Sequence, residues 1–238
     1  MKKPLVSLFL LLFPILTEAH SYWLELKGSG NVGEPMTVQC YFGELENGLR
    51  EKGPALNGIK SFTASVLLPD GTTEPLTLSP ADNCYQAQFT TKQAGTYQVL
   101  LVNDTRAVQN WTKHNLGIVR PREYLRAICQ IGGGTLSAKP VFYLDATPQS
   151  KPAAGKVATV VLITKDGAAY PNAPVKLTMP NGKQSKLTTD GNGLLTLTST
   201  GAGQYVVDVD FMDKTPGKYQ DKDYQAIRNK MALTLTIL

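Results

Sequence analysis

Histidine is scarce in this chain of 238 residues, which contains only His20 and His114. A catalytic Ser-His-Asp arrangement would have to use one of them, yet no Gly-x-Ser-x-Gly motif marks a nucleophile. The sequence also lacks His-Glu-x-x-His, Cys-x-x-Cys and the phosphate-binding Gly-x-x-x-x-Gly-Lys. We therefore expect a protein that is not an enzyme.

One sequence motif matches the dinucleotide-binding fingerprint by letter only. Residues 28–33, GSGNVG, fit the pattern Gly-x-Gly-x-x-Gly, but that fingerprint must open a helix whose amino end holds the pyrophosphate. Here Glu34 and Pro35 lead into a strand-like run over 36–38. We interpret the segment as a glycine-rich hairpin.

Positive charge is not concentrated anywhere in the chain. The formal net charge is +5, and it becomes +4 without residues 1–19, which carry two lysines and one glutamate. The largest basic cluster is Arg120, Arg122 and Arg126. It is too small to neutralise a run of phosphates. We expect no nucleic-acid partner, and we expect these arginines to form a solvated face.

Long apolar runs are missing except at the amino end. Lys2 and Lys3 precede an apolar run over 5–16, and the small-residue exit Thr17-Glu18-Ala19 follows it. About a dozen residues are too few to cross a hydrocarbon core as a helix, so the run is typical of a secretory signal. We expect removal of residues 1–19, a mature chain without a transmembrane segment, and a periplasmic location. An uncleaved anchor is the alternative.

Cysteine is also rare, with Cys40, Cys84 and Cys129, so a monomer must leave at least one of them unpaired. Cys40 alternates with Val38 and is expected to point into a core, whereas Cys84 shares a face with Gln86. This difference argues against a bond between Cys40 and Cys84. If one bond exists, we favour Cys84 with Cys129; buried thiols without a bridge are the alternative.

The sequence contains an internal repeat with an offset of about 110 residues, which is the length of one sandwich domain. Pro-Asp-Gly at 69–71 and Ala-Gly-Thr-Tyr at 94–97 return as Pro-Asn-Gly at 180–182 and Ala-Gly-Gln-Tyr at 202–205. The first motif is a hairpin turn that needs positive φ angles. In the second, the tyrosine resembles the tyrosine corner of immunoglobulin-like sandwiches.

The predicted fold class is all-β, with two tandem immunoglobulin-like β-sandwich domains after a cleaved signal peptide. Alternating β-branched or aromatic and polar residues predict short strands, and no helical period appears. The strands most clearly expected cover 62–68, 156–164, 194–198 and 232–238. We place the signal peptide at 1–19 and the domains at 20–134 and 135–238, with the glycines at 132–134 at the join.

Cleavage after Ala19 would make His20 the first residue of the mature chain. Its α-amine and imidazole Nδ1 would then close a six-membered chelate ring on one metal ion. An imidazole nitrogen from His114 would complete a histidine brace. Such donors favour Cu²⁺ over Ni²⁺, Co²⁺ and Zn²⁺. The candidate metal ligands are His20 and His114, and the candidate cofactor is a divalent transition metal: Cu, Ni or Co. Alternatively, His114 is an ordinary exposed loop residue.

The opening of the mature chain resembles a known but poorly characterised family. Ala19-His20 and then Trp23-Leu24 match the Ala-His-x-x-Trp-Leu start of bacterial periplasmic proteins that are often assigned to cobalt or nickel uptake systems. In the second domain, 171–175 and 189–193 are similar to prealbumin-like modules. The resemblance implies a metal-handling role in the periplasm, with His20 at the matching position and a metal transporter component of the inner membrane as partner. It does not extend to His114.

Three functions remain in competition. The first is a periplasmic protein that binds or delivers a divalent transition metal. The second is a non-catalytic exported binding or adhesion module without metal, for which Tyr22, Trp23 and Trp111 are candidates for an exposed aromatic strip; core packing is the other interpretation of these side chains. The third is a copper-dependent oxidase or oxygenase, which would need an open coordination position.

Overall fold

The structure is a computed structural model that describes residues 20–132, 136–150, 158–199 and 201–237. The predicted signal peptide, residues 1–19, lies outside these ranges, and so does most of the predicted glycine join, at 133–135. Cleavage and the domain limits therefore stay predictions. The described chain is all-β, as the sequence predicts. Its helical segments are the 3-10 helices η1 (Leu45–Asn47), η2 (Gly53–Ser61) and η3 (Thr112–His114).

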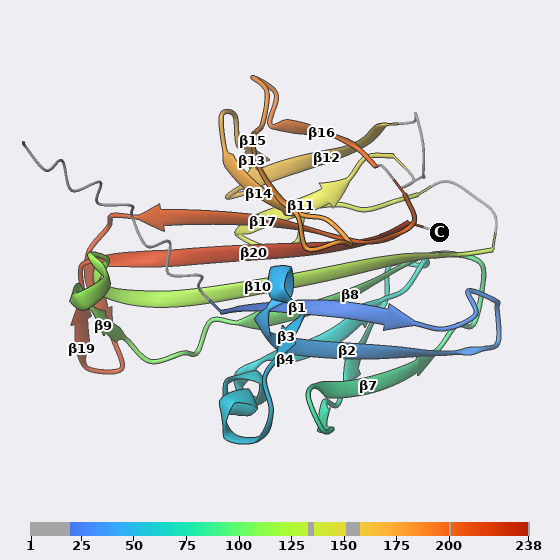
Figure 1. Cartoon of the computed structure of the whole chain (residues 1–238), viewed down its shortest axis with the longest axis horizontal. Coiled ribbons are helices and arrows are strands. Elements are labelled where there is room, and N and C mark those ends of the chain that lie inside the picture. The colour runs from blue at the N-terminus through green and yellow to red at the C-terminus, as the bar shows by residue number, and fades with distance from the viewer. Residues whose placement is uncertain (1–19, 133–135, 151–157, 200, 238) are drawn as a thin grey trace, which may run out of the picture.

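The strands form two outer sheets and one long central sheet (Figure 1). The first outer sheet contains β1 (Ser21–Lys27), β2 (Pro35–Glu44), β3 (Leu49–Arg50), β6 (Ser79–Pro80) and β7 (Tyr85–Thr90). The second outer sheet contains β11 (Leu144–Pro148), β12 (Ala158–Lys165), β13 (Ala168–Ala169) and β16 (Leu194–Thr198).

The central sheet runs through both halves of the chain. Its strand order is β5 (Thr73–Leu76), β4 (Thr63–Leu67), β8 (Gly95–Asn103), β10 (Gly117–Ile131), β20 (Ala226–Ile237), β17 (Gly203–Asp213), β14 (Pro174–Thr178) and β15 (Gln184–Thr188). Strand β9 (Gln109–Trp111) also pairs with β10. A separate hairpin is formed by β18 (Gly217–Tyr219) and β19 (Lys222–Tyr224).

The two outer sheets cover opposite faces of the central sheet. On β10, Leu125 and Ala127 belong to the core shared with the first outer sheet, whereas Tyr124 and Ile128 belong to the core shared with the second. Successive side chains of a strand point to opposite faces. The molecule is therefore three sheets deep where the central sheet is covered on both faces, and Figure 1 shows the central sheet between β12 on one side and β2 on the other.

The internal repeat predicted from the sequence is confirmed by the strand order. From β10 outward the order is β8, β4, β5, and from β20 outward it is β17, β14, β15. Likewise β2 pairs with both β1 and β7, and β12 pairs with both β11 and β16. Strands β10 and β20 are parallel neighbours. A half-turn about an axis along these two strands relates the halves, and it exchanges the faces of the sheet.

The two tyrosines of the repeat occupy equivalent positions, as predicted. The hydroxyl of Tyr97 donates to the carbonyl of Gln93 at 3.0 Å, and that of Tyr205 donates to the carbonyl of Gly201, also at 3.0 Å. Each bond reaches back four residues across the turn that precedes the strand. Both halves therefore contain a tyrosine corner.

The repeated glycines are explained by the repeated prolines. A Cβ added to Gly95 would lie 2.6 Å from Pro69, and one added to Gly203 would lie 2.6 Å from Pro180. Each proline opens the Pro-Asp-Gly or Pro-Asn-Gly turn of its own half, so the two motifs pack against each other. Only glycine allows this approach.

The expectation of a solvated arginine face was wrong for Arg126, which is 0% exposed. It lies between Tyr124 and Ile128 on the face of β10 that the second outer sheet covers. Its Nε and Nη2 donate to the two carboxylate oxygens of Asp145 at 3.1 and 2.7 Å. The arginine is buried because β10 is an internal strand of the central sheet. The spacing of the three arginines in the sequence does not reveal that position.

All three cysteines are free thiols, so the favoured bond between Cys84 and Cys129 is not formed. Cys40 points into the first core as predicted. The Cys84 Sγ accepts a hydrogen bond from Gln39 Nε2 at 3.7 Å, and Gln39 pairs with Gln86. Cys84 thus lies on the glutamine face, as predicted, but it is buried there.

Residues 28–33 connect the antiparallel strands β1 and β2 with positive φ at Gly30 and Gly33, so the fingerprint-like segment is a hairpin connection. No helix in the described ranges has the length and apolar character needed to cross a membrane.

Candidate functional site

His20 stands immediately before β1, beside the end of β2. In the register of these strands Ser21 pairs with Gly43 and Tyr22 pairs with Phe42. Continuing that register by one residue places His20 next to Glu44, the last residue of β2. The His20 side chain is 36% exposed, so solvent and solutes reach the imidazole.

The imidazole of His20 lies between two carboxylates. Its Nε2 is 2.8 Å from Glu51 Oε1, and its Nδ1 is 3.6 Å from Glu44 Oε1. A carboxylate can only accept a hydrogen bond, so Nε2 is the donor in the first contact. The second separation is longer than a hydrogen bond. The ring of Phe42 lies 5.2 Å from the imidazole, centroid to centroid.

A tight hairpin brings the two glutamates to the histidine. Strand β2 leads through η1 to β3, and the Glu51 amide donates to the Phe42 carbonyl at 2.9 Å. Gly43 has a φ of 153°, and a Cβ on it would lie 2.2 Å from the Leu49 carbonyl oxygen. Gly48, with a φ of 68°, closes η1. Glycine is therefore required where β3 folds back over β2.

The start of β1 is anchored by aromatic packing below the histidine. The Tyr22 ring lies 4.6 Å from Phe42 and 5.1 Å from Phe62. A Cβ on Gly58 would lie 2.3 Å from the Tyr22 hydroxyl, so η2 packs directly on this ring. Burial raises the pKa of Tyr22 to about 12. The aromatic cluster fixes the position from which His20 projects.

His114 is the last residue of η3, and its side chain is exposed. Helix η3 lies between β9 and β10 at one end of the central sheet (Figure 1). Among the contacts of the described residues, no hydrogen bond, ion pair or ring contact joins His114 to His20. His114 as a second ligand of the same ion therefore stays a prediction.

No three His, Cys, Asp or Glu side chains in the described ranges form a ready-made metal site. At His20 the reason is geometric. Glu44 lies beside Nδ1 and Glu51 lies beside Nε2, so the two carboxylates cannot join the same ring nitrogen in binding one ion. An α-amine of a chain that begins at His20 would add a donor on the Nδ1 side. The residues therefore fit a metal only when that amine is free.

Sequence reasoning missed Glu44 and Glu51. Glycines 43 and 48 were the available signal, because paired glycines around a short polar segment are typical of a tight turn. That signal predicts a hairpin, but it does not say which side chain the hairpin approaches.

The proposed aromatic strip is not exposed. Tyr22 and Trp23 are 8% and 1% exposed, so the core-packing interpretation is confirmed for both. Trp23 stacks on Tyr41 at 5.4 Å. Trp111 is half-buried beneath the guanidinium groups of Arg106 and Arg228, at 5.5 and 5.7 Å from its ring.

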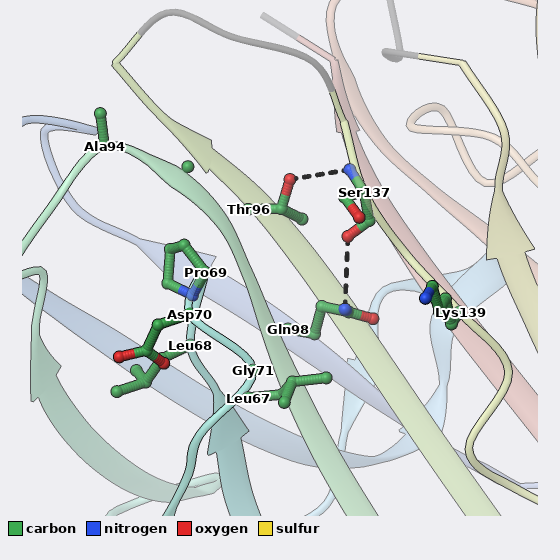
Figure 2. A pocket seen from close by; sticks show the side chains of 11 residues that line it. Leu67, Leu68, Pro69, Asp70, Gly71, Ala94, Thr96, Gln98, Ser137 and Lys139 are labelled. Atoms are coloured by element: carbon green, nitrogen blue, oxygen red, sulfur yellow. Dashed lines mark hydrogen bonds between the residues drawn. The ribbon is translucent and has the colours of Figure 1, made fainter.

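A cavity of about 470 Å³ lies elsewhere, where the turn between β4 and β5 approaches the start of β8 (Figure 2). Thr96 Oγ1 accepts from the Ser137 amide at 3.0 Å, and Gln98 Nε2 donates to the Ser137 carbonyl at 3.4 Å. These bonds attach the segment that leads to the second half. The cavity contains neither candidate histidine.

Comparison with family models gives one match, described as "Domain of unknown function (DUF4198)", over residues 17–213. A comparison with curated proteins gives no match.

Three solved structures are similar in part. SGBP-B of the Bacteroides ovatus mixed-linkage glucan utilization locus, in complex with a mixed-linkage heptasaccharide, has 12% identity and a TM-score of 0.23 over 90% of this chain and 45% of its own. The D00-D0 domain of intimin has 16% identity and a TM-score of 0.22 over 91% of this chain and 100% of its own. CfaE, the adhesive subunit of the CFA/I fimbria of enterotoxigenic Escherichia coli, has 8% identity and a TM-score of 0.13 over 91% and 86%.

Proposed function

This chain belongs to the family described as a domain of unknown function (DUF4198), and we propose that it is a periplasmic protein that binds or delivers a divalent transition metal. The metal is cargo, and the protein has a non-enzymatic role. The predicted signal peptide supports the location. The resemblance to proteins assigned to cobalt or nickel uptake supports an inner-membrane transporter component as the partner.

The observation that carries the proposal is the state of the His20 ring. The side chain is 36% exposed, Nε2 is held by Glu51 at 2.8 Å, and Nδ1 makes no hydrogen bond of normal length. Nδ1 is the ring nitrogen that closes a six-membered chelate with the α-amine of the same residue. Two nitrogen donors of this kind suit Cu²⁺, Ni²⁺ or Co²⁺.

The other candidate functions have less support. A copper-dependent oxidase or oxygenase built on a histidine brace needs His114, which has no contact with His20 in the described structure. The candidate aromatic strip of a metal-free adhesion module was Tyr22, Trp23 and Trp111. Of these, Tyr22 and Trp23 are buried and Trp111 is half-buried.

The test is calorimetric titration of a chain that begins at His20 with Cu²⁺, Ni²⁺ and Co²⁺. We expect one ion per chain. A five-residue Gly-Ser extension before His20 should weaken binding by at least about 100-fold, because it displaces the amine from the chelate. An extension of one or two residues is unsuitable, since it places the histidine where backbone amides create a new copper site.

Two further chains complete the design. The variant His20→Ala should lose binding, and His114→Ala tests the second predicted ligand directly; we expect it to bind as the unmodified chain does. Equal affinity of the free and extended chains would refute the proposed site.

A further inference from the structure

We propose that two glutamates complete the His20 centre: Glu44 supplies a carboxylate oxygen as third ligand, and Glu51 positions the imidazole by accepting a hydrogen bond from its Nε2–H group. This inference rests on the proposed function, and it names the residues that sequence reasoning did not find. The ligands would then be the α-amine and Nδ1 of His20 and one carboxylate oxygen of Glu44, and His114 would not be needed.

Glu51 determines which ring nitrogen is available. Its Oε1 lies 2.8 Å from Nε2, and the carboxylate can only accept, so the proton of a neutral imidazole is placed on Nε2. The lone pair then belongs to Nδ1. Histidines that bind metal commonly donate their other N–H to a carboxylate in this way, which fixes the tautomer and the ring orientation. Here the contact selects the nitrogen that the amine chelate requires.

Glu44 lies on the side of the ring where the metal would bind. Its Oε1 is 3.6 Å from Nδ1, whereas two donor atoms on one ion with bonds of about 2.0–2.1 Å are separated by about 3.0–3.4 Å. A shift of a few tenths of an ångström closes this difference. The other oxygen, Oε2, accepts a hydrogen bond from Asn47 Nδ2 at 3.0 Å. Asn47 thereby directs Oε1 toward His20.

Charge favours the same arrangement. Two carboxylates flank one exposed imidazole, and a divalent cation on Nδ1 would offset their combined negative charge. Three protein donors leave further positions on the ion open to water or to a partner's ligand. Such a site releases its ion more readily than a closed four-ligand site, which suits a protein that passes its cargo on.

An ion pair without metal is the competing explanation, because a protonated His20 would also sit well between Glu44 and Glu51. The two explanations differ in what each glutamate does to metal affinity. In the ion-pair case, removing a carboxylate removes a competitor for the imidazole, so metal affinity would stay the same or rise.

The experiment is Ni²⁺ titration by calorimetry of four chains that all begin at His20: unmodified, Glu44→Gln, Glu51→Gln, and Glu34→Gln as the control. Glu34 is an exposed glutamate just before β2, so its variant makes the same charge change outside the site. We expect Glu44→Gln and Glu51→Gln each to weaken binding by about 10- to 100-fold, with Glu34→Gln unchanged. Circular dichroism melting of each apo variant identifies any loss of fold.

Copper electron paramagnetic resonance supplies a second readout for the ligand itself. Replacing a carboxylate oxygen at Glu44 should alter the copper spectrum, whereas Glu51→Gln, which changes only a positioning residue, should alter affinity with the same donor set. If the unmodified chain binds Ni²⁺ and both variants bind it equally well or better, the inference is overturned while the proposed function stands. If the unmodified chain binds no metal, both fail.

Discussion

At the scale of single residues, the most consequential contact outside the His20 site is the buried pair Arg126 and Asp145. Both side chains are 0% exposed. Arg126 also donates to Gln98 Oε1, and Asp145 Oδ2 accepts the amides of Val141 and Phe142 at 2.7 and 3.0 Å. Because each charge is hydrogen-bonded on several sides, the pair is tolerated in the interior. It joins β10 of the first half to β11 of the second.

Removing one partner of this pair should be costly. In Arg126→Leu the Asp145 carboxylate stays buried without its counter-charge, so we expect the free energy of unfolding to fall by about 3–5 kcal/mol. Urea denaturation followed by circular dichroism measures the change. Lys52→Leu is the control, because Lys52 and its partner Asp82, 2.6 Å away, are both exposed, and the change should cost about 1 kcal/mol or less. Comparable losses in the two variants would show that Arg126 has no special role.

At the scale of elements, the hairpin from β2 through η1 to β3 builds the candidate site. It carries Glu44 at the end of one strand and Glu51 just after the other, and its geometry depends on glycine. The approach of β3 to Gly43 leaves no space for a Cβ beside the Leu49 carbonyl. The position of both glutamates is therefore a property of the hairpin, and through the hairpin it depends on Gly43.

Gly43→Ala should lower both stability and metal affinity. The added methyl would lie 2.2 Å from backbone at a φ of 153°, so β3 must move and take Glu51 with it. We expect a loss of about 2 kcal/mol or more in unfolding free energy and at least about 10-fold in Ni²⁺ affinity. Thermal melting and calorimetry measure the two effects.

Gly30→Ala is the matched control for that variant. Gly30 also has a positive φ, 75°, but nothing lies within 4 Å of an added Cβ, so only the backbone cost of about 1–2 kcal/mol applies. It should keep full metal affinity. Equal Ni²⁺ affinity of Gly43→Ala and Gly30→Ala would show that the hairpin does not position the glutamates for the metal.

At the scale of the whole molecule, the two sandwiches share one sheet. Strands β10 and β20 pair in parallel from Val119 with Ala226 to Ile128 with Leu235. In tandem domains joined only by a linker, β10 and β20 would each be an edge strand without a neighbour on one side. Here each half covers the other's edge strand, and the half-turn relation places the two outer sheets on opposite faces. The halves are thus one structural unit.

This continuity predicts a single cooperative unfolding transition. Differential scanning calorimetry of the chain from residue 20 onward should give a calorimetric enthalpy equal to the van't Hoff enthalpy. A chain of residues 20–134 alone should not fold cooperatively, because it exposes the long edge of β10 and the apolar face that the second half covers. Two separate transitions, or a cooperatively folded fragment, would contradict the shared-sheet account.

The sequence by itself determined the local features of this protein. Alternation with period two, turn residues such as Asp70-Gly71 and Asn181-Gly182, and the corner tyrosines Tyr97 and Tyr205 are written in short segments, so the all-β class and the repeat could be predicted. It also indicated His20, since chelation by an amino-terminal histidine involves one residue.

Only the tertiary structure decided what lies beside these elements. The parallel pairing of β10 with β20 joins segments about 100 residues apart, and no local period encodes such a partner. For the same reason the sequence predicted Arg126 to be a surface charge, although it is buried against Asp145. Glu44 and Glu51 reach His20 only because β1 pairs with β2 and a glycine turn folds β3 back. A strand's own pattern says which face is apolar, but its neighbours are set by long-range packing.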